Sequence, residues 1–482
     1  MREKEKKDIT EKYILMGVIE TLSPLHIGSG FDDRSDMDIL LDSNNTPFIP
    51  ATSLIGVLRH MIQSEYPDNP KIKQFWGFVE KKNQNEKNPQ ARQEASQSRV
   101  YCSDLLCCSE NFKIDIRDGI RIDHSTGIVE DNGKFTFEIL ERGTRFQLKM
   151  EFDVHVNESQ FTKQMIATIV DILKNKDVQK DNTKISYQRP FQLGAKTNNG
   201  LGNIKLVKNS EKLYQFDFSE KSHVFRWITQ DFNDDQQAAF QNLGEPLSVQ
   251  SNPFIIKAHF HLKDSLIIRS YSDDPKMPDA THLKSKDDWV LSGSSIKGAI
   301  RARAERILNT LGIKTLTIAD IFGYVPDKDD ARDKSKRAKK GNILVSETIL
   351  PRFISEMQSR IKIDRLTGGT IDTALFDTMP VFSDLNEKEL IITVHLNDLK
   401  SNKMKASAGL LLLVLKDLWT GDLAIGGEKN VGRGTLQGIS ATIIYEGKKI
   451  DINKGFIPEN ESDKDCLTNL VNALILGGNN GN

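Results

Sequence analysis

The chain has 482 residues, of which 38% are apolar and 28% are charged, and its formal net charge is −1. This length exceeds what one hydrophobic core usually supports, so we expect a globular protein with two domains. The balanced charge excludes a positive potential over the whole protein that would attract nucleic acid. A local basic groove that binds nucleic acid is still compatible with this net charge.

The predicted elements follow one another in a mixed order. In the first half, a helix follows Ser53, a polar insertion covers 80–99, strands cover 134–139 and 145–156, and apolar helical spacing covers 161–173. In the second half, a helix follows Ser295, a second polar insertion covers 326–340, and a strand and a helix cover 389–396 and 404–418. Ser53 and Ser295 are the predicted N-caps. Strands interleaved with two helices predict an α+β fold of the ferredoxin-like or RRM-like kind in each half.

The two halves are copies of one unit. Six pairs of matching segments occur in the same order in the two halves. The offset in residue number between matched segments falls from about 242 to 232, and a difference in the length of one polar loop before residue 194 accounts for this change. The matched pairs are 23–33 with 264–274, 49–59 with 290–301, QFWGF with DIFGY, RVYCSDLL with NILVSETI, 121–127 with 362–368, and 194–202 with 426–434. We therefore expect a first domain at 1–214, a linker at 215–252, a second domain at 253–446 and a tail at 447–482.

The N-terminus and the cysteines indicate a cytoplasmic chain. The segment MREKEKKDITEK is charged and predicts no secretory signal. The longest aliphatic run, 409–415, is far shorter than the roughly 20 residues that span a membrane, so we expect no membrane partner. Cys102, Cys107, Cys108 and Cys466 form no CxxC pair, which favours reduced, buried side chains, with a zinc site as the alternative.

Each copy ends in a glycine-rich loop, GAKTNNGLG or GGEKNVGRG. Neither loop reads GxxxxGK[ST], and neither shows GxGxxG opening a helix, so we predict no nucleotide cofactor. The polar, strand-like residues that follow indicate that the glycines let the backbone of a long ligand pass closely. A plain turn between helix and strand is the alternative. The candidate binding glycines are Gly194, Gly200, Gly202, Gly426, Gly427, Gly432 and Gly434.

Several motifs resemble the RAMP superfamily of CRISPR proteins. They are LHIGSG, PFIPATSLIGVLR, VLSGSSIKGAIRARAE and the paired GLG and GRG loops. They are most similar to the Cas-seven-type backbone subunits of type III effector complexes, and the fused double copy resembles the type III-D variants. This resemblance implies an RNA-recognition-type palm with a β-hairpin thumb in each copy. It also implies guide crRNA, target RNA, Cas-ten-like and other RAMP subunits as partners.

The resemblance further implies a nuclease aspartate in the loop before the helix motif. In the first copy this is Asp36, six residues before Asp42, and Asp38 at the family's proline position is the second choice. In the second copy it is Asp279, with Ser285 where a trailing aspartate is expected. Such an aspartate can bind Mg²⁺ or Mn²⁺ or act as a base towards the 2′-OH of RNA, which attacks the adjacent phosphate to leave a 2′,3′-cyclic phosphate.

Basic and small residues predict where RNA binds. The thumbs are expected at 119–139 and 360–382, with His124 and Arg365 aligned as phosphate contacts or turn residues; His124 as a general acid is less favoured. Lys297 occupies the family's lysine position, where the first copy has Ile55, and Arg433 occupies the place of Leu201. The remaining candidates lie at the helix starts and loops: Ser53, Arg59, Ser294, Ser295, Arg301, Lys196 and Lys429.

Three functions follow from these patterns. The first is guide-directed cleavage of target RNA at two sites, as an endoribonuclease. The second is a structural subunit that binds the guide and does not cleave. The two functions are distinguished by whether divalent metal triggers cutting of the target RNA. The third is a guide-processing endonuclease, which usually relies on a histidine. No histidine recurs at aligned positions in the two copies, which disfavours this third function.

Overall fold

A computed structural model provides the structure of the chain. It describes residues 8–30, 33–79, 95–123, 126–175, 179–181, 184–186, 190–232, 240, 242–248, 253–271, 276–326, 338–383, 389–397 and 401–479. In these ranges, no helix is long and apolar enough to cross a membrane.

The first unit is an antiparallel sheet with helices. Its strand order is β12-β1-β9-β5, and β13 also pairs with β1. Taken in chain order, the four main strands are arranged 4-1-3-2, which is the order of a ferredoxin-like fold. The elements are β1 (Ile9–Thr21), α1 (Ala51–Glu65), α2 (Pro70–Trp76), β5 (Val100–Cys102), β9 (Arg145–His155), α3 (Ser159–Lys174), β12 (Ile204–Leu206) and β13 (Lys212–Asp217).

The second unit repeats this topology. Its sheet has the order β22-β28-β14-β29-β30. Numbered along the chain, the first four of these strands read 2-3-1-4, which is the order of the first unit read from the opposite edge of the sheet. The α+β fold predicted for both halves is thus confirmed. The elements are β14 (Phe254–Leu262), α5 (Gly293–Leu311), α6 (Ile318–Phe322), β22 (Ile343–Val345), β28 (Leu390–Leu396), α7 (Asn402–Thr420), β29 (Leu436–Tyr445), β30 (Lys448–Ile452) and α8 (Glu461–Asn479).

Alternation along the strands and helical spacing build the two cores. In β9, alternate side chains face inward, and Phe146, Leu148, Met150 and Phe152 are buried. In α3, the predicted apolar face is buried against this sheet. The core of the second unit is formed in the same way by β14, β28, β29, α5 and α7.

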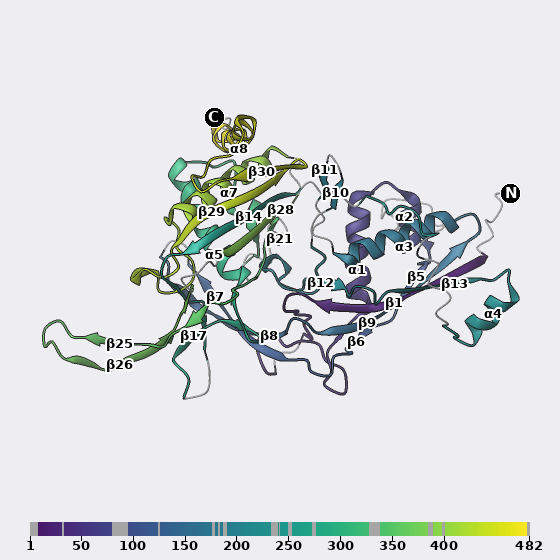
Figure 1. Ribbon diagram of the computed structural model, residues 1–482, viewed down its shortest axis with the longest axis horizontal. Helices are drawn as coiled ribbons and strands as arrows, with labels where there is room; N and C mark the ends of the chain where they lie inside the picture. The colour runs from purple at the N-terminus through teal and green to yellow at the C-terminus, as the bar shows by residue number, and fades with distance from the viewer. Residues whose placement is uncertain are drawn as a thin grey trace, which may run out of the picture.

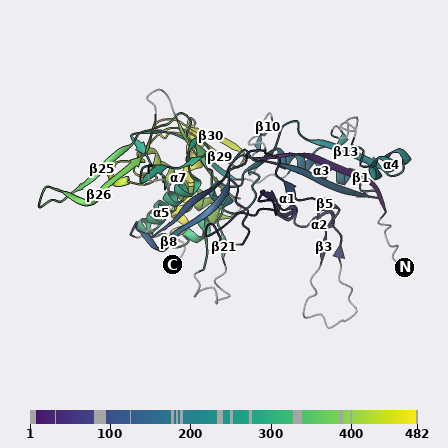
Figure 2. The same cartoon turned by 90° about the horizontal axis from the view of Figure 1, so that it is seen from below.

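Each unit carries a long two-stranded hairpin, as the thumb prediction requires. The first is β7 (Ile114–Ile122) with β8 (Val129–Leu140), and the second is β25 (Gln358–Ile363) with β26 (Thr370–Met379). Figure 1 shows β7–β8 reaching from the first unit beneath the second, whereas β25–β26 projects away from the body of the molecule, as Figure 2 also shows. The two hairpins therefore meet different surroundings.

Shorter elements complete the fold, and the flanking segments pack onto the units. The expected domain end at residue 214 falls inside β13, and the expected tail from residue 447 contains β30, which pairs with β29, and α8, which packs on α7. The remaining elements are β2 (Phe48–Ile49), β3 (Phe78–Val79), β4 (Ala95–Ser96), β6 (Leu105–Leu106), β10 (Gln179–Asp181), β11 (Lys184–Ser186), η1 (Thr197–Asn199), α4 (Lys221–Ile228), β15 (Ser265–Leu266), β16 (Arg269–Ser270), β17 (Ala280–His282), β18 (Lys284–Ser285), β19 (Asp288–Leu291), β20 (Gly323–Tyr324), β21 (Lys339–Lys340), β23 (Thr348–Ile349), β24 (Ile354–Ser355), β27 (Val381–Phe382) and η4 (Lys429–Val431).

The two units are joined by contacts from the first hairpin and the first glycine loop. Arg117 on β7 forms a two-pronged ion pair with Glu347 of the second unit, at 2.5 and 3.2 Å. Both side chains are buried, so replacing either residue by an uncharged one would leave the charge of the other buried and unpaired. The Asn198 amide donates to the Gly341 carbonyl at 2.9 Å. We call this contact region the unit junction.

Gly200 lies where the two backbones of the unit junction come closest. Its φ is +88°, and a Cβ there would lie 2.4 Å from the Glu347 nitrogen. Its counterpart Gly432 also has φ +88° but has no atom within 4 Å of such a Cβ. Backbone strain thus constrains both glycines, whereas only Gly200 is also constrained by the opposite unit.

We expect Gly200→Ala to destabilise the protein more than the matched control Gly432→Ala. Each change costs about 1–2 kcal/mol of backbone strain, and the clash at Gly200 adds about 1–3 kcal/mol. Urea unfolding should show the difference. Hydrogen exchange should also be faster at residues 343–347 in Gly200→Ala only; equal effects of the two variants would contradict the junction contact.

Candidate active site

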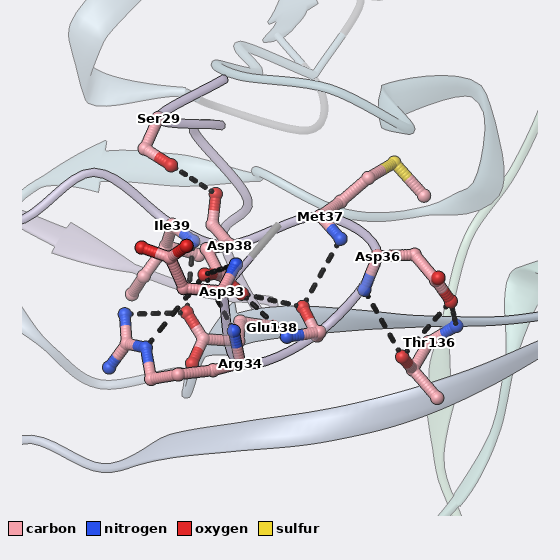
Figure 3. Close-up of polar contacts among 10 residues, drawn as sticks. Ser29, Asp33, Arg34, Asp36, Met37, Asp38, Ile39, Thr136 and Glu138 are labelled. Atoms are coloured by element: carbon pink, nitrogen blue, oxygen red, sulfur yellow. Dashed lines mark hydrogen bonds and ion pairs between the residues drawn. The ribbon is translucent and has the colours of Figure 1, made fainter. Parts of the chain in front are cut away.

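The loop before α1 is organised around Asp38. Its carboxylate accepts hydrogen bonds from the backbone nitrogens of Asp33, Arg34 and Ser35 at 2.8–3.0 Å and from the Ser35 hydroxyl at 2.9 Å. Figure 3 shows these donors converging on it. Burial raises the pKa of Asp38, but these hydrogen bonds outweigh burial and hold it below its usual value. Asp38 therefore shapes the loop and is buried away from solvent.

Asp36 points the other way, towards the first hairpin. Its side chain is exposed, and its Oδ2 accepts hydrogen bonds from the Thr136 nitrogen at 2.6 Å and the Thr136 hydroxyl at 3.2 Å. Thr136 lies on β8, and Figure 3 shows Asp36 beside it and away from the Asp38 cluster. The buried Glu138, also on β8, binds Arg34 and the Ile39 nitrogen, both at 3.0 Å. The loop and the base of the hairpin thus form one structure.

Asp279 occupies the equivalent place in the second unit. It is exposed, and its Oδ2 accepts a hydrogen bond from the Asp377 nitrogen of β26 at 2.8 Å. Asp377 and Thr136 are equivalent residues, because the 241-residue shift that aligns Gly127 with Gly368 also aligns them. Each copy therefore presents an exposed carboxylate bonded to the second strand of its own hairpin. Thr136 and Asp377 were missed in the sequence, although this shift could have identified them.

The helix starts differ from the prediction at the N-caps. The N-cap of α1 is Pro50 and that of α5 is Ser292, so the assignment of Ser53 and Ser295 as N-caps is wrong. Both serines lie in the first helical turn. The Ser295 nitrogen donates to the Ser292 hydroxyl, and in the first unit the carboxylate of Asp104, between β5 and β6, accepts a hydrogen bond from the Ala51 nitrogen at 2.8 Å. Capping by a distant side chain leaves no local sequence signal.

Basic residues on α5 lie beside this helix start. Lys297 is half-buried, and burial, reinforced by Arg301, lowers its pKa to about 8. Among the residues that the structure describes, no carboxylate pairs with Lys297. Arg301 and Ser294 are exposed. On α1, Arg59 donates to Gln63 at 3.1 Å, one turn further along. The second unit therefore presents the stronger cationic site.

The two glycine loops share one backbone but differ in chemistry. Lys196 and Glu428 occupy the same left-handed position, with φ +57° and +55°. The Lys196 ammonium lies 4.6 and 4.3 Å from the ring centroids of Phe135 and Phe137 on β8, and burial lowers its pKa. Its charge is thus directed onto the hairpin of its own unit. The RNA-binding role of this loop stays a prediction.

Glu428 instead binds three arginines. Arg269, Arg360 and the buried Arg433 lie 3.1, 2.8 and 3.3 Å from its carboxylate oxygens. The first unit has Gly28, Gly119 and Leu201 at the corresponding positions. This arginine cluster fastens the second glycine loop to the base of β25–β26, and it was not recognised in the sequence beyond Arg433 itself.

The other candidates lie apart from these sites. Arg365 is exposed at the tip of the second hairpin, beside the Asp364 turn, and Lys429 is exposed in η4. His124 lies outside the described residues. Burial raises the pKa of Cys102 to about 12, so it is a thiol packed against the first core. Within the described ranges, no group of three His, Cys, Asp or Glu residues is arranged to hold a metal ion.

We expect Asp38→Asn to loosen the loop that presents Asp36. Because the pKa of Asp38 is lowered, its contribution is present at neutral pH and is lost only as the pH falls through that lowered value. Hydrogen exchange at the backbone nitrogens of Asp33, Arg34 and Ser35 should accelerate at neutral pH. Asp33→Asn, which keeps the backbone donor, is the control, and unchanged exchange in Asp38→Asn would contradict this role.

The comparison with known proteins agrees with the duplicated architecture. The model of the RAMP superfamily matches residues 18–205 and 259–437, more than half of the chain and one region in each unit. No curated protein matches the sequence. This match supports a CRISPR-associated protein that binds RNA. The chain belongs to the RAMP superfamily and carries two RAMP domains in tandem.

Proposed function

We propose that the protein is a backbone subunit of a type III CRISPR effector complex, that it binds guide crRNA, and that it cleaves complementary target RNA at two sites. The fused pair of domains favours the type III-D variants. The observation that carries the proposal is the equivalent placement of Asp36 and Asp279. Each is an exposed carboxylate at the base of a long hairpin, where a displaced nucleotide of a duplex would come within reach.

The chemistry needs little more than positioning. In an A-form duplex, the 2′-oxygen is not in line with the phosphorus and the leaving 5′-oxygen, so a nucleotide has to be displaced before cleavage. The 2′-oxygen then attacks phosphorus, the bond to the 5′-oxygen breaks, the 5′-oxygen takes a proton from water and leaves as a hydroxyl group, and a 2′,3′-cyclic phosphate remains. Asp36 or Asp279 would accept the proton of the 2′-OH, and their exposure leaves them accessible to RNA.

The same aspartates would hold Mg²⁺ or Mn²⁺. Asp36 fits this role because its Oδ1 makes no hydrogen bond with the described residues, whereas Oδ2 is fixed by Thr136. Each aspartate would provide one oxygen ligand, and water and phosphate would provide the others. When bound, the ion would polarise the scissile phosphate.

Guide binding would use Lys297 and Arg301 of α5, which form no ion pair with any carboxylate that the structure describes. Lys297 lies in the second turn of α5, near the helix N-terminus where backbone donors and the helix dipole favour phosphate, and Arg301 follows one turn later. A phosphate would supply the missing partner of Lys297 and restore its ordinary pKa. These features support the second unit as the stronger guide contact.

We expect Asp36→Ala and Asp279→Ala each to remove one of two cuts in a labelled target, and the double variant to remove both. A lost catalytic carboxylate of this kind costs about 10²-fold or more in rate. The purified guide-loaded complex should be assayed with and without divalent metal. Asp33→Ala and Asp287→Ala are exposed, matched controls that should keep both cuts. If the double variant still made both cuts, the cleavage proposal would be wrong, and the structural role without cleavage would be the function of this subunit.

We expect Lys297→Ala to weaken guide binding and to reduce the dependence of log K on log salt by about one unit, as the loss of one phosphate contact predicts. Because the pKa of Lys297 is about 8 and a bound phosphate would raise it, the wild type should lose affinity as the pH rises above about 8. Lys297→Arg should lose less, since arginine stays protonated. Lys464→Ala on α8 is the control. A wild type as insensitive to pH as Lys297→Arg would contradict this contact.

A further inference from the structure

The loops that present Asp36 and Asp279 correspond residue by residue. Each loop ends in a residue that pairs back onto the chain before the loop, Ile39 in the first unit and His282 in the second. These two residues are 243 positions apart, as are Asp36 and Asp279. This shift is two larger than the shift of 241 that relates the residues before the loops, so the second loop is two residues longer. The shift of 243 therefore identifies which side chains the two loops share.

The second loop has lost the carboxylate that organises the first. Thr281 stands at the position of Asp38, whose carboxylate collects the backbone nitrogens of the first loop. Pro278 stands at the position of Ser35 and has no N–H to donate to such a carboxylate. The second loop thus cannot form the hydrogen-bonded cluster that fixes the first.

The ion pair beneath the first loop is also replaced in the second. Arg34 and Glu138 form this pair in the first unit, and Met277 and Met379 stand at their positions in the second. The two methionines line a cavity of about 290 Å³ between β7 and the second unit. The side chains that support the first loop from below therefore have no polar equivalent under the second.

The first unit supplies a carboxylate to the second loop region from outside. Ser285, which stands at the position of Asp42, donates a hydrogen bond from its hydroxyl to Oε2 of Glu141 at 2.5 Å. Both side chains are fully buried. Ser285 lies in β18, which follows β17 after one residue, and β17 begins directly after Asp279. The bond therefore ties the strands that follow Asp279 to the first unit.

Glu141 is held firmly by its own unit. Its backbone nitrogen donates to the Lys113 carbonyl at 2.9 Å, and its carbonyl accepts the Thr144 hydroxyl at 2.8 Å. Its Oε1 is buried and makes no hydrogen bond with the described residues. Loss of the Ser285 hydroxyl would thus leave both oxygens of a buried carboxylate without a donor, which costs far more than an exposed bond does.

The two residues after Glu141 extend this contact along the same part of the second unit. Arg142 forms an ion pair with Asp288 of β19, the strand that pairs with β18. Lys286 lies in the turn between these strands, and a Cβ at Gly143 would lie 2.8 Å from its Nζ. Residues 141–143 of the first unit therefore contact the β18–β19 hairpin on both of its strands and at its turn.

We propose that Glu141 is a positioning residue for Asp279: by binding Ser285, it holds in place the strands that present the carboxylate of the second site. This rests on the proposed cleavage function and names a residue of the first unit on which only the second site depends. Asp36 is independent of the contact, because Asp38 organises its loop within the first unit. The second unit thus requires the first for an ordered site, whereas the first does not require the second.

Hydrogen exchange of the full chain tests the contact without RNA. We expect Ser285→Ala to accelerate exchange at residues 279–285 by about tenfold or more, since a hydrogen bond to a buried carboxylate is lost. Asp42→Ala, at the equivalent position of the first unit, is the matched control. It frees the Asn44 and Thr46 nitrogens and should leave residues 279–285 unchanged. Wild-type exchange at residues 279–285 in Ser285→Ala would overturn the proposal.

A compensating change in the first unit separates positioning by Glu141 from local packing of Ser285. The double variant Ser285→Ala with Glu141→Met replaces the buried polar pair by two apolar side chains and so removes the unpaired carboxylate. We expect its exchange at residues 279–285 and its thermal midpoint to return towards the wild-type values. This variant also tests the contact if Ser285→Ala alone fails to fold. A double variant no better than Ser285→Ala would show that Glu141 does not act through Ser285.

The two cuts in the guide-loaded complex measure the same dependence at each site. We expect Ser285→Ala to slow the cut that Asp279→Ala removes by about tenfold or more, because a misplaced reacting group loses rate. The cut that Asp36→Ala removes should keep its rate. Equal slowing of both cuts, or no slowing of either, would overturn the proposal. A wild-type complex that makes neither cut would reject only the cleavage function, and the exchange measurements would still decide whether Glu141 orders the second loop region.

Discussion

The close approach of two backbones at the unit junction governs how the rest of the molecule is arranged. At Gly200 and Gly293, one unit lies so near the other that neither position can carry a side chain. This contact, with the buried pair of Arg117 and Glu347, fixes where the first hairpin lies against the second unit. The positions of the two aspartate loops along the molecule follow from the same contact, since each loop is bonded to its own hairpin.

Duplication has preserved the backbone while the side chains have diverged. Both copies keep the strand order, the hairpin, the exposed aspartate and the left-handed glycine positions. The fastening of the loop to the hairpin differs, with Lys196 over two phenylalanine rings in one copy and Glu428 among three arginines in the other. The geometry at the hairpin base is therefore common to both copies, and the interactions that maintain it are not.

Internal repetition and the alternation of apolar residues in the sequence were sufficient to predict the duplication and the fold of each unit, and the family resemblance implied the hairpins. The sequence was insufficient where a contact joins distant residues. The helix start of α1 is capped by Asp104, more than fifty residues away, and this explains why Ser53 was taken for the N-cap. The glycines of the first loop suggested a ligand, whereas the burial of Gly200 comes from the other unit. Family resemblance located Asp36 and Asp279, but their bonds to Thr136 and Asp377 needed the structure.

The arginine cluster around Glu428 prevents the two glycine loops from being exchanged between the units. The two loops differ at five of nine residues, and two of these differences, Lys196 against Glu428 and Leu201 against Arg433, decide how each loop is held. An exchange that carried the first loop into the second unit would place lysine among Arg269 and Arg360 and remove their only shared carboxylate among the described residues. The reverse exchange would place a carboxylate over the rings of Phe135 and Phe137. Each loop is thus compatible only with the hairpin of its own unit.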